Sequence, residues 1–536
     1  MYECPNCAGN LKFDIARQQL YCEYCGTQAD PYSFEKERDA EETRVSSGRY
    51  EVTIFTCPQC GGELISEDTT AATFCSFCGA STILDSRISR KKRPDFIIPF
   101  TRTKEDCRNA YKKMLRRAVF APKELKDEKH IEKFRGIYMP YWVYSFERKG
   151  LMSFPGKQTC RSGDYLITDH YELNCHAEEE YRGLAYDASS TFSDSLSGAI
   201  APFDMRQGKA FAPSFLSGFY ADTSDVKKQV YLQEAEDIVV QDVARILEGD
   251  PICRKYHAGE ERTFEWALKP AKQTVQLAML PVWFLSYRNG DRVSYAVVNG
   301  QTGKAAADLP VDLKKYLAGS LLLALPLFLL LNLFLTVTPG KVLMIAVLLA
   351  VLCIFISNAQ LSHILARESG ENDRGLAAAR GMLREYNARH KKRKPVRISW
   401  NGSIMSITMI AWIGLQIVAI GGLKEMVIAI LPILLPAIMF YAVFHIGLGR
   451  GDSGKKLSYG GHFKEKWPVL IKPFIGIMFA LVILVMKPVS DWFYYIGAFG
   501  CMGMLLWAIM DIIRQHNMLT TRKLPQLGRR GGDELE

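Results

Sequence analysis

The feature that most constrains this chain is a pair of identical cysteine arrays near its N-terminus. Each array has the form C-x2-C-x14-C-x2-C, and the second repeats the first at an offset of 53 residues. The candidate metal ligands are Cys4, Cys7, Cys22 and Cys25 in the first array and Cys57, Cys60, Cys75 and Cys78 in the second. The repetition indicates an internal duplication of one small metal-binding unit.

The spacing of each array predicts a zinc ribbon. Two residues between cysteines let one tight turn present both thiolates to one ion, and the longer spacer can form a β-hairpin that joins two such turns. Four thiolates close a tetrahedral site, so we expect two structural zinc ions and no catalytic one. Iron remains the alternative metal because thiolates accept both. Gly26 and Gly79, directly after the last cysteine of each array, supply backbone freedom.

Each array is too small to fold around a hydrophobic core, so metal binding is expected to provide its folding free energy. The other six of the 14 cysteines are scattered without ligand spacing, at Cys107, Cys160, Cys175, Cys253, Cys353 and Cys501. This usage favours metal binding in a reducing compartment over a disulfide framework. The first residues lack the basic and apolar regions of a signal peptide, so none is expected.

Residues 95–311 have the pattern of a mixed α/β region. We expect a strand over 95–100, a helix over 103–118, an aromatic strand over 134–146 and a helix over 224–248. The run MLPVWFLSY at 279–287 is a weaker echo of YMPYWVYS at 138–145. Asn299-Gly300 is a hairpin turn signal after the strand that follows.

Catalytic motifs are missing from the sequence. It has no phosphate-binding loop, no H-E-x-x-H and no G-x-S-x-G. His170 and His176 would lie on one face of a strand and Cys175 on the other, which fits no zinc-hydrolase pattern. The sequence therefore predicts that the chain is not an enzyme.

The C-terminal part alternates apolar runs with basic loops. Six runs of about 20 residues pass the length test for spanning helices, at 317–337, 341–358, 401–421, 425–447, 469–487 and 491–512. Because the long loops and the tail are basic, we expect three helical hairpins in the cytoplasmic (inner) membrane with both termini in the cytoplasm. The runs carry no charge at mid-depth, which favours an anchor or assembly role over conduction.

Basic segments next to these runs are candidates for lipid contact. An amphipathic helix is expected over 373–390, and Lys391, Lys392, Arg393 and Lys394 follow it as predicted binding residues for anionic lipid. These charges could also serve only to set topology. The basic run at 87–93 reads as a solvated linker, with contact to lipid head groups or nucleic acid as the alternative.

The expected fold class is multidomain: two small β zinc ribbons, a mixed α/β soluble domain and an all-α six-helix transmembrane region. The expected order is ribbon 1 (1–30), linker (31–54), ribbon 2 (55–82), basic linker (83–94), cytoplasmic α/β domain (95–311), transmembrane hairpin 1 (312–358), basic loop with the amphipathic helix (359–400), transmembrane hairpin 2 (401–447), cytoplasmic loop (448–468), transmembrane hairpin 3 (469–512) and cytoplasmic tail (513–536).

Several short motifs accompany the ribbons over residues 1–311. They are IPF at 98–100, FAP at 120–122, GIYMPYW at 136–142, LSGF at 216–219 and NGQTG at 299–303. Together the pattern resembles bacterial membrane proteins that contain TFIIB-type zinc ribbons. The resemblance implies a cytoplasm-facing partner in an envelope-stress system, beside PspA-like and SPFH-domain scaffold proteins. Some members of this group are labelled as replication-restart helicases, which the missing phosphate loop contradicts here.

The sequence therefore favours a membrane-anchored adaptor that recruits cytoplasmic proteins to the bilayer, in which homo-oligomers are possible. The first alternative is a membrane-tethered regulator that binds nucleic acid. It is disfavoured because most excess positive charge of the +10 net total lies beside the apolar runs, and because ribbon 1 carries Glu3, Asp14, Glu23 and Asp30. The second alternative, a transporter or membrane enzyme, is disfavoured by the missing motifs and the uncharged runs.

Overall fold

The computed structural model describes residues 2–34, 49–66, 75–80, 84–258, 268, 270, 272–334, 339–368, 373–379, 381–390, 475–480, 482–483, 486 and 488–523. The chain divides into two compact units. The first comprises Met1–Leu309, Gly370–Tyr386 and Thr521–Glu536, and the second comprises Pro310–Ser369 and Asn387–Thr520. The chain therefore enters the second unit twice and returns to the first unit twice.

The first cysteine array forms a three-stranded antiparallel sheet. Its strands are β1 (Leu11–Asp14), β2 (Gln19–Cys22) and β3 (Gln28–Ala29), in that order. Leu11 and Leu20 are fully buried, and Phe13 packs its ring 5.2 Å from that of Phe215 in the short helix η5 (Pro213–Leu216). The alternating burial of β1 explains why this hairpin forms on the surface of the larger domain.

A 12-stranded mixed sheet forms the body of the first unit, with the central order β10-β7-β12-β8-β11-β5-β4-β6. Its strands are β4 (Arg49–Thr56), β5 (Glu63–Ser66), β6 (Asp85–Lys92), β7 (Phe96–Ile97), β8 (Arg135–Ser162), β9 (Tyr165–Asp187), β10 (Lys209–Ala210), β11 (Tyr220–Ala221), β12 (Lys272–Asn289), β13 (Arg292–Asn299), β14 (Ala305–Ala307) and β15 (Arg522–Lys523). The second cysteine array lies between β4 and β6 along the chain, and its strand β5 belongs to this sheet, so this array is not a separate small domain. All four residues of β5 are buried, which explains the merger.

The two motifs that echo each other in the sequence lie opposite each other in this sheet. β8 and β12 pair antiparallel, with Pro140 opposite Met279 and Tyr138 opposite Pro281. Their tryptophans also behave alike: Trp142 Nε1 donates to Val226 O at 2.7 Å, and Trp283 Nε1 donates to Arg102 O at 3.0 Å. The echo therefore marks the two central strands of the sheet.

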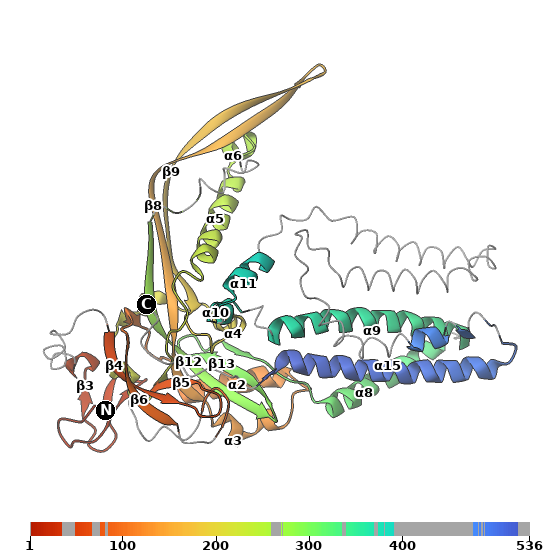
Figure 1. Cartoon of the computed structure of the whole chain (residues 1–536), viewed down its shortest axis with the longest axis horizontal. Helices are drawn as coiled ribbons and strands as arrows, with labels where there is room; N and C mark the ends of the chain where they lie inside the picture. The colour runs from red at the N-terminus through yellow and green to blue at the C-terminus, as the bar shows by residue number, and fades with distance from the viewer. Residues whose placement is uncertain are drawn as a thin grey trace. The chain divides into compact units, whose positions relative to one another are not determined.

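β8 and β9 continue as a long two-stranded hairpin whose outer part is exposed (Figure 1). The helices α5 (Leu232–Gly249) and α6 (Pro251–Lys255) come later in the chain. The end of α6 contacts the hairpin, since Lys157 N of β8 donates to Tyr256 O at 2.6 Å. The sequence predicted only the inner part of β8, since alternation of apolar and polar residues fades where both faces meet solvent.

The remaining helices of the first unit cover the sheet. They are α2 (Lys104–Arg117), α3 (Glu128–Ile131), α4 (Asp194–Ile200), α10 (Arg374–Ala379) and α11 (Leu383–His390), with short turns η1 (Pro31–Phe34), η3 (Glu124–Lys126) and η4 (Met205–Gln207). The amphipathic segment expected over 373–390 is thus two short helices. Ala378 and Leu383 pack against the core that α5 forms with β8, so this apolar face is covered by protein.

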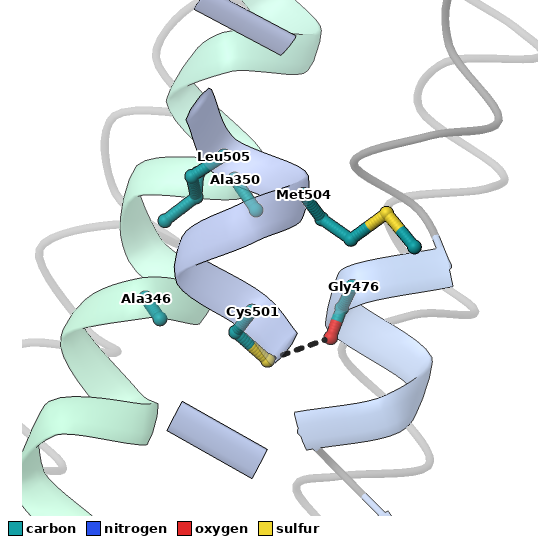
Figure 2. A pocket seen from close by; sticks show the side chains of 6 residues that line it. All are labelled: Ala346, Ala350, Gly476, Cys501, Met504 and Leu505. Carbon is teal, nitrogen blue, oxygen red and sulfur yellow. Dashed lines mark hydrogen bonds between the residues drawn. The ribbon is translucent and has the colours of Figure 1, made fainter. Parts of the chain in front are cut away.

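In the second unit, helices α8 (Leu313–Phe334), α9 (Pro339–Glu368) and α15 (Asp491–Thr520) are described. Leu343, Ala346 and Ala350 of α9 form a core with Cys501 and Leu505 of α15. Figure 2 shows the small apolar gap where α9 and α15 meet the helical residues 475–480, and there Cys501 Sγ donates to Gly476 O at 3.4 Å. Alanine and glycine at the contact allow the helices to approach closely.

These findings correct the expected fold class and location. Among the residues that the structure describes, one helix is long and apolar enough to cross a membrane, Trp492–Thr520. An all-α six-helix transmembrane region is therefore wrong, and so is the multi-pass location derived from it. Apolar runs alone do not separate a spanning helix from a packed one, and α9 buries part of its apolar surface against α15. The runs expected at 401–421 and 425–447 lie outside the described residues.

Candidate metal centres

Four turns with one hydrogen-bonding pattern carry the eight cysteines. In each turn the amide of the first cysteine donates to the carbonyl oxygen five residues later, at 2.7–2.9 Å, and its own carbonyl accepts from the amide four residues later, at 2.8–3.0 Å. The first cysteines of the four turns are Cys4, Cys22, Cys57 and Cys75. This shared geometry supports the duplication that the sequence indicates.

The residue four positions after the first cysteine has a positive φ in every turn. Three of these residues are glycines, with φ of 77° at Gly26, 73° at Gly61 and 69° at Gly79. The fourth is Ala8, at 56°, which is the one position where the duplicated turn places a side chain in the left-handed region. The sequence analysis identified Gly26 and Gly79 but missed Ala8 and Gly61, although aligning all four turns would have found them.

The cysteine sulfurs gather into two groups, each with all four Sγ atoms within 4.8 Å of one another. The Sγ–Sγ separations are 3.5 Å for Cys4–Cys25 and Cys7–Cys22, 3.8 Å for Cys57–Cys78 and 3.7 Å for Cys60–Cys75. A tetrahedral site with bonds of about 2.3 Å to zinc places its sulfurs about 3.8 Å apart. A disulfide would need about 2.05 Å. The prediction of two Cys4 groups that could hold structural metals is therefore confirmed.

The two groups differ in exposure. In the first, Cys4 and Cys22 are buried, whereas Cys7 and Cys25 are exposed. Thr27 Oγ1 lies 3.0 Å from Cys25 Sγ, and hydrogen bonds from this hydroxyl and from the Thr27 amide lower the pKa of the Cys25 thiol to about 6. A thiol that loses its proton this readily is suited to bind a cation at neutral pH.

The second group is enclosed, with all four cysteines buried. Phe77, between its last two cysteines, packs against Phe284 with ring centroids 6.1 Å apart, and its carbonyl accepts from the Tyr295 hydroxyl at 2.8 Å. A Cβ on Gly79 would lie 3.3 Å from Ser286 Oγ, so this turn presses directly against β12. The second centre is therefore built into the core of the large sheet.

Opposite charges are paired on the surface of the first ribbon. Lys12 Nζ lies 3.1 Å from Glu23 Oε2, and Arg17 Nη1 lies 2.7 Å from Asp14 Oδ2. Tyr24, which precedes Cys25, is 82% exposed. A Cβ on Gly9 would lie 2.7 Å from Tyr24 Cδ2 and 3.2 Å from Cys7 Sγ, so this glycine makes room for both.

The other residues considered from the sequence are not brought into a metal site. His170 and His176 are exposed along β9, and the described residues hold no third cluster of His, Cys, Asp or Glu with metal-binding geometry. The predicted lipid-binding residues Lys391, Lys392, Arg393 and Lys394 lie outside the described residues. Residues 85–92, expected within a basic linker, form β6 and pair with β4.

Comparison with known proteins gives one similarity that bears on this site. The chain is 28% identical over 336 residues to the protein named uncharacterized protein YdjG of Bacillus subtilis (strain 168), and the alignment covers 61% of this chain and 96% of YdjG. No protein-family model matches the chain, and no solved structure matches it. This similarity and the two Cys4 groups together fit a chain that carries zinc ribbons.

Proposed function

We propose that the chain is an adaptor whose first ribbon, of the TFIIB type, binds a protein partner while an apolar helix holds the chain at a lipid bilayer. The observation that carries this proposal is the unequal placement of the two Cys4 groups. The second is enclosed in the core, whereas the first presents both of its turns to solvent. In this proposal the enclosed second copy of the duplicated unit stabilises the domain, and the exposed first copy binds a partner.

The exposed turn has the surface chemistry of a protein-binding site. Tyr24 offers a large ring and a hydroxyl on a backbone that metal ligation at Cys22 and Cys25 would hold rigid. Aromatic side chains on rigid elements supply much of the contact energy at protein interfaces. Zinc is the metal we propose for both centres, since the sulfur separations match its tetrahedral radius.

Nucleic acid is the less favoured ligand of this ribbon. Its basic side chains Lys12 and Arg17 are each paired with a carboxylate at 2.7–3.1 Å. Binding to a phosphate backbone requires cations that are free to replace counterions. The paired charges suit a polar rim around Tyr24 better than an electropositive groove.

Attachment to a bilayer is proposed for α15. Phe499, Leu506 and Trp507 of this helix are exposed, and Trp492 lies near its start. Tryptophan is enriched where helices leave the hydrocarbon core. In this proposal the partners are scaffold proteins at the membrane face, of the PspA-like or SPFH type that the sequence resemblance implies, together with anionic lipid. Two further points remain predictions: that the chain is not an enzyme, and that it can form homo-oligomers.

The test uses a photo-crosslinking amino acid at position 24 of the full chain, with position 246 on α5 as a control that is also largely exposed. We expect a defined protein adduct from position 24 that is lost when Cys7 and Cys25 are replaced by serine. Adducts to nucleic acid would favour the tethered regulator.

Flotation with anionic liposomes tests the anchor: Phe499→Arg with Leu506→Arg should abolish flotation, whereas Ile246→Arg should not.

A further inference from the structure

The two Cys4 centres have the same ligands and turns but opposite access to solvent. Cys7 and Cys25 are exposed in the first centre, whereas each cysteine of the second is at most 3% exposed. Thiolate chemistry requires a reagent to reach the sulfur. The chain therefore contains one Cys4 centre that a reagent can reach and a matched one that is enclosed.

The first ribbon is also attached to its domain by contacts that do not depend on metal. Phe13 N donates to Ser217 O at 3.1 Å, and Ser217 Oγ donates to Leu11 O at 2.5 Å. Gln18 Nε2 donates to Phe100 O at 2.7 Å. Since the hairpin is held by these bonds and by buried Leu11, loss of the metal would free the two turns without releasing the hairpin.

The second ribbon has no such separation between turns and core. Phe77 and Gly79 of its last turn contact Phe284, Tyr295 and Ser286 of β12 and β13. Loss of the metal would leave four buried thiols without a ligand inside the sheet. Removal of this ion would thus require the core to open.

We propose that the first Cys4 centre is an exchangeable, oxidant-sensitive zinc site and that the second is a permanent structural one. The exchange adds a regulatory property to the exposed ribbon and does not require a bound partner. In the metal-bound state the Tyr24 turn is fixed, and in the metal-free state it is released from Cys4 and Cys7. The occupancy of this centre would then report the zinc supply or the presence of a peroxide.

The oxidation uses a peroxide as a two-electron oxidant. The Cys25 thiolate attacks one peroxide oxygen, the O–O bond breaks, hydroxide leaves and a sulfenic acid forms. The Cys7 thiolate then attacks Cys25 Sγ, the S–S bond forms and the second hydroxide leaves. Two protons from solvent convert the hydroxides to water. With Cys7 and Cys25 joined in a disulfide, only Cys4 and Cys22 would remain to hold a zinc ion, so the ion would be released; a thiol reductant would reduce the disulfide and restore both thiolates.

The experiment follows zinc release from the zinc-loaded full chain with a colorimetric indicator, after addition of EDTA or hydrogen peroxide. Because the second centre opens only with the core, we expect its ion to leave about 100-fold more slowly than the first. Mass spectrometry after alkylation should find Cys7 and Cys25 oxidised and Cys57, Cys60, Cys75 and Cys78 protected. Dithiothreitol with zinc should restore the starting state.

Two variants separate the centres. Cys7→Ser with Cys25→Ser should remove the fast phase and leave the slow phase and the far-ultraviolet circular dichroism unchanged. Cys60→Ser with Cys78→Ser is expected to prevent folding, so the wild-type alkylation map is the deciding measurement for the second centre. Equal release rates, or oxidation of the second centre first, would overturn the proposal.

Discussion

Arg522 Nη2 donates a 2.7 Å hydrogen bond to Ser193 Oγ, the side chain that also caps the first turn of α4. The next residue, Asp194, accepts from Arg374 N at 2.7 Å and from the Tyr231 hydroxyl at 2.6 Å. Arg374 and Arg522 belong to the two segments in which the chain returns to the first unit. Both returns therefore converge on the start of one short helix.

Replacing Arg522 should destabilise the first unit. Its guanidinium also lies 3.3 Å from Asp308 Oδ2 and 5.4 Å from the centre of the Tyr295 ring. Because hydrogen bonds that involve a charged group contribute about 1.5–3 kcal/mol, Arg522→Ala should lower the free energy of unfolding by about 2 kcal/mol, measured by denaturant titration. Arg522→Lys should lose less. The exposed pair of Arg245 and Asp242 supplies the control, since Arg245→Ala should change stability by less than about 0.5 kcal/mol. A loss as large at Arg245 would mean that the Arg522 effect is not specific.

Docking of the 373–386 segment should weaken as the pH rises. Burial, assisted by the charge of Asp194, raises the pKa of Asp373 from 3.8 to about 7. Burial, assisted by the charges of Asp194 and Asp373, likewise raises the pKa of Asp187. An acid with a raised folded pKa holds its proton more tightly when folded, so its contribution is greatest below about pH 4, declines up to about pH 7 and is constant above.

Hydrogen exchange of amides 373–386 at pH 5.5 and pH 8, corrected for intrinsic rates, measures this effect. Asp373→Asn should reduce the pH slope, and addition of Asp187→Asn should reduce it further. In the native chain the Leu376 amide donates to Asp373 Oδ1 at 2.8 Å and so caps the helix. Asparagine is a suitable replacement because its side-chain oxygen can accept the same hydrogen bond. An unchanged slope in the double variant would exclude these two carboxyls as its source.

Local sequence rules predicted the metal-binding turns well because ligand spacing fixes their geometry directly. They placed all eight cysteines in two groups and predicted α2 over 103–118, where Thr103 and Asp106 form a capping box. They failed where long-range burial decides the outcome. The second ribbon looks like a separate unit, but β4 and β5 join a sheet whose other strands range along the chain from Asp85–Lys92 to Arg522–Lys523. The apolar run that contains α9 looked like a spanning helix because no sequence pattern reveals its contact with α15.

The NGQTG motif at 299–303 should tolerate little change, because its backbone touches an aromatic core. A Cβ on Gly300 would lie 2.5 Å from Phe100 Cδ1 and 2.8 Å from Pro281 Cβ. Overpacking of this kind costs about 1–3 kcal/mol, so Gly300→Ala should lower the unfolding free energy by that amount. Gly198 in α4 has open space around its Cα, and Gly198→Ala should be neutral or stabilising by up to about 1 kcal/mol. If both variants behave alike, the contact with Phe100 is not what restricts position 300.

Ala8→Gly should strengthen the first metal centre. Ala8 has a φ of 56°, at the position that glycine occupies in the other three turns. A side chain in the left-handed region costs about 1–2 kcal/mol, whereas glycine costs about 0.4–1 kcal/mol more unfolded-state entropy. The middle of these ranges favours the variant by about 0.8 kcal/mol, which corresponds to about fourfold tighter zinc binding at the first centre. Competition with a chelator of known affinity measures this constant.

Gly26→Ala is the matched reverse change in the partner turn and should weaken binding by a similar factor. The second centre should keep its affinity in both variants, since the changed residues belong to the other ribbon. Tighter binding at both centres, or weaker binding in Ala8→Gly, would show that backbone strain at Ala8 does not limit the affinity of the first centre.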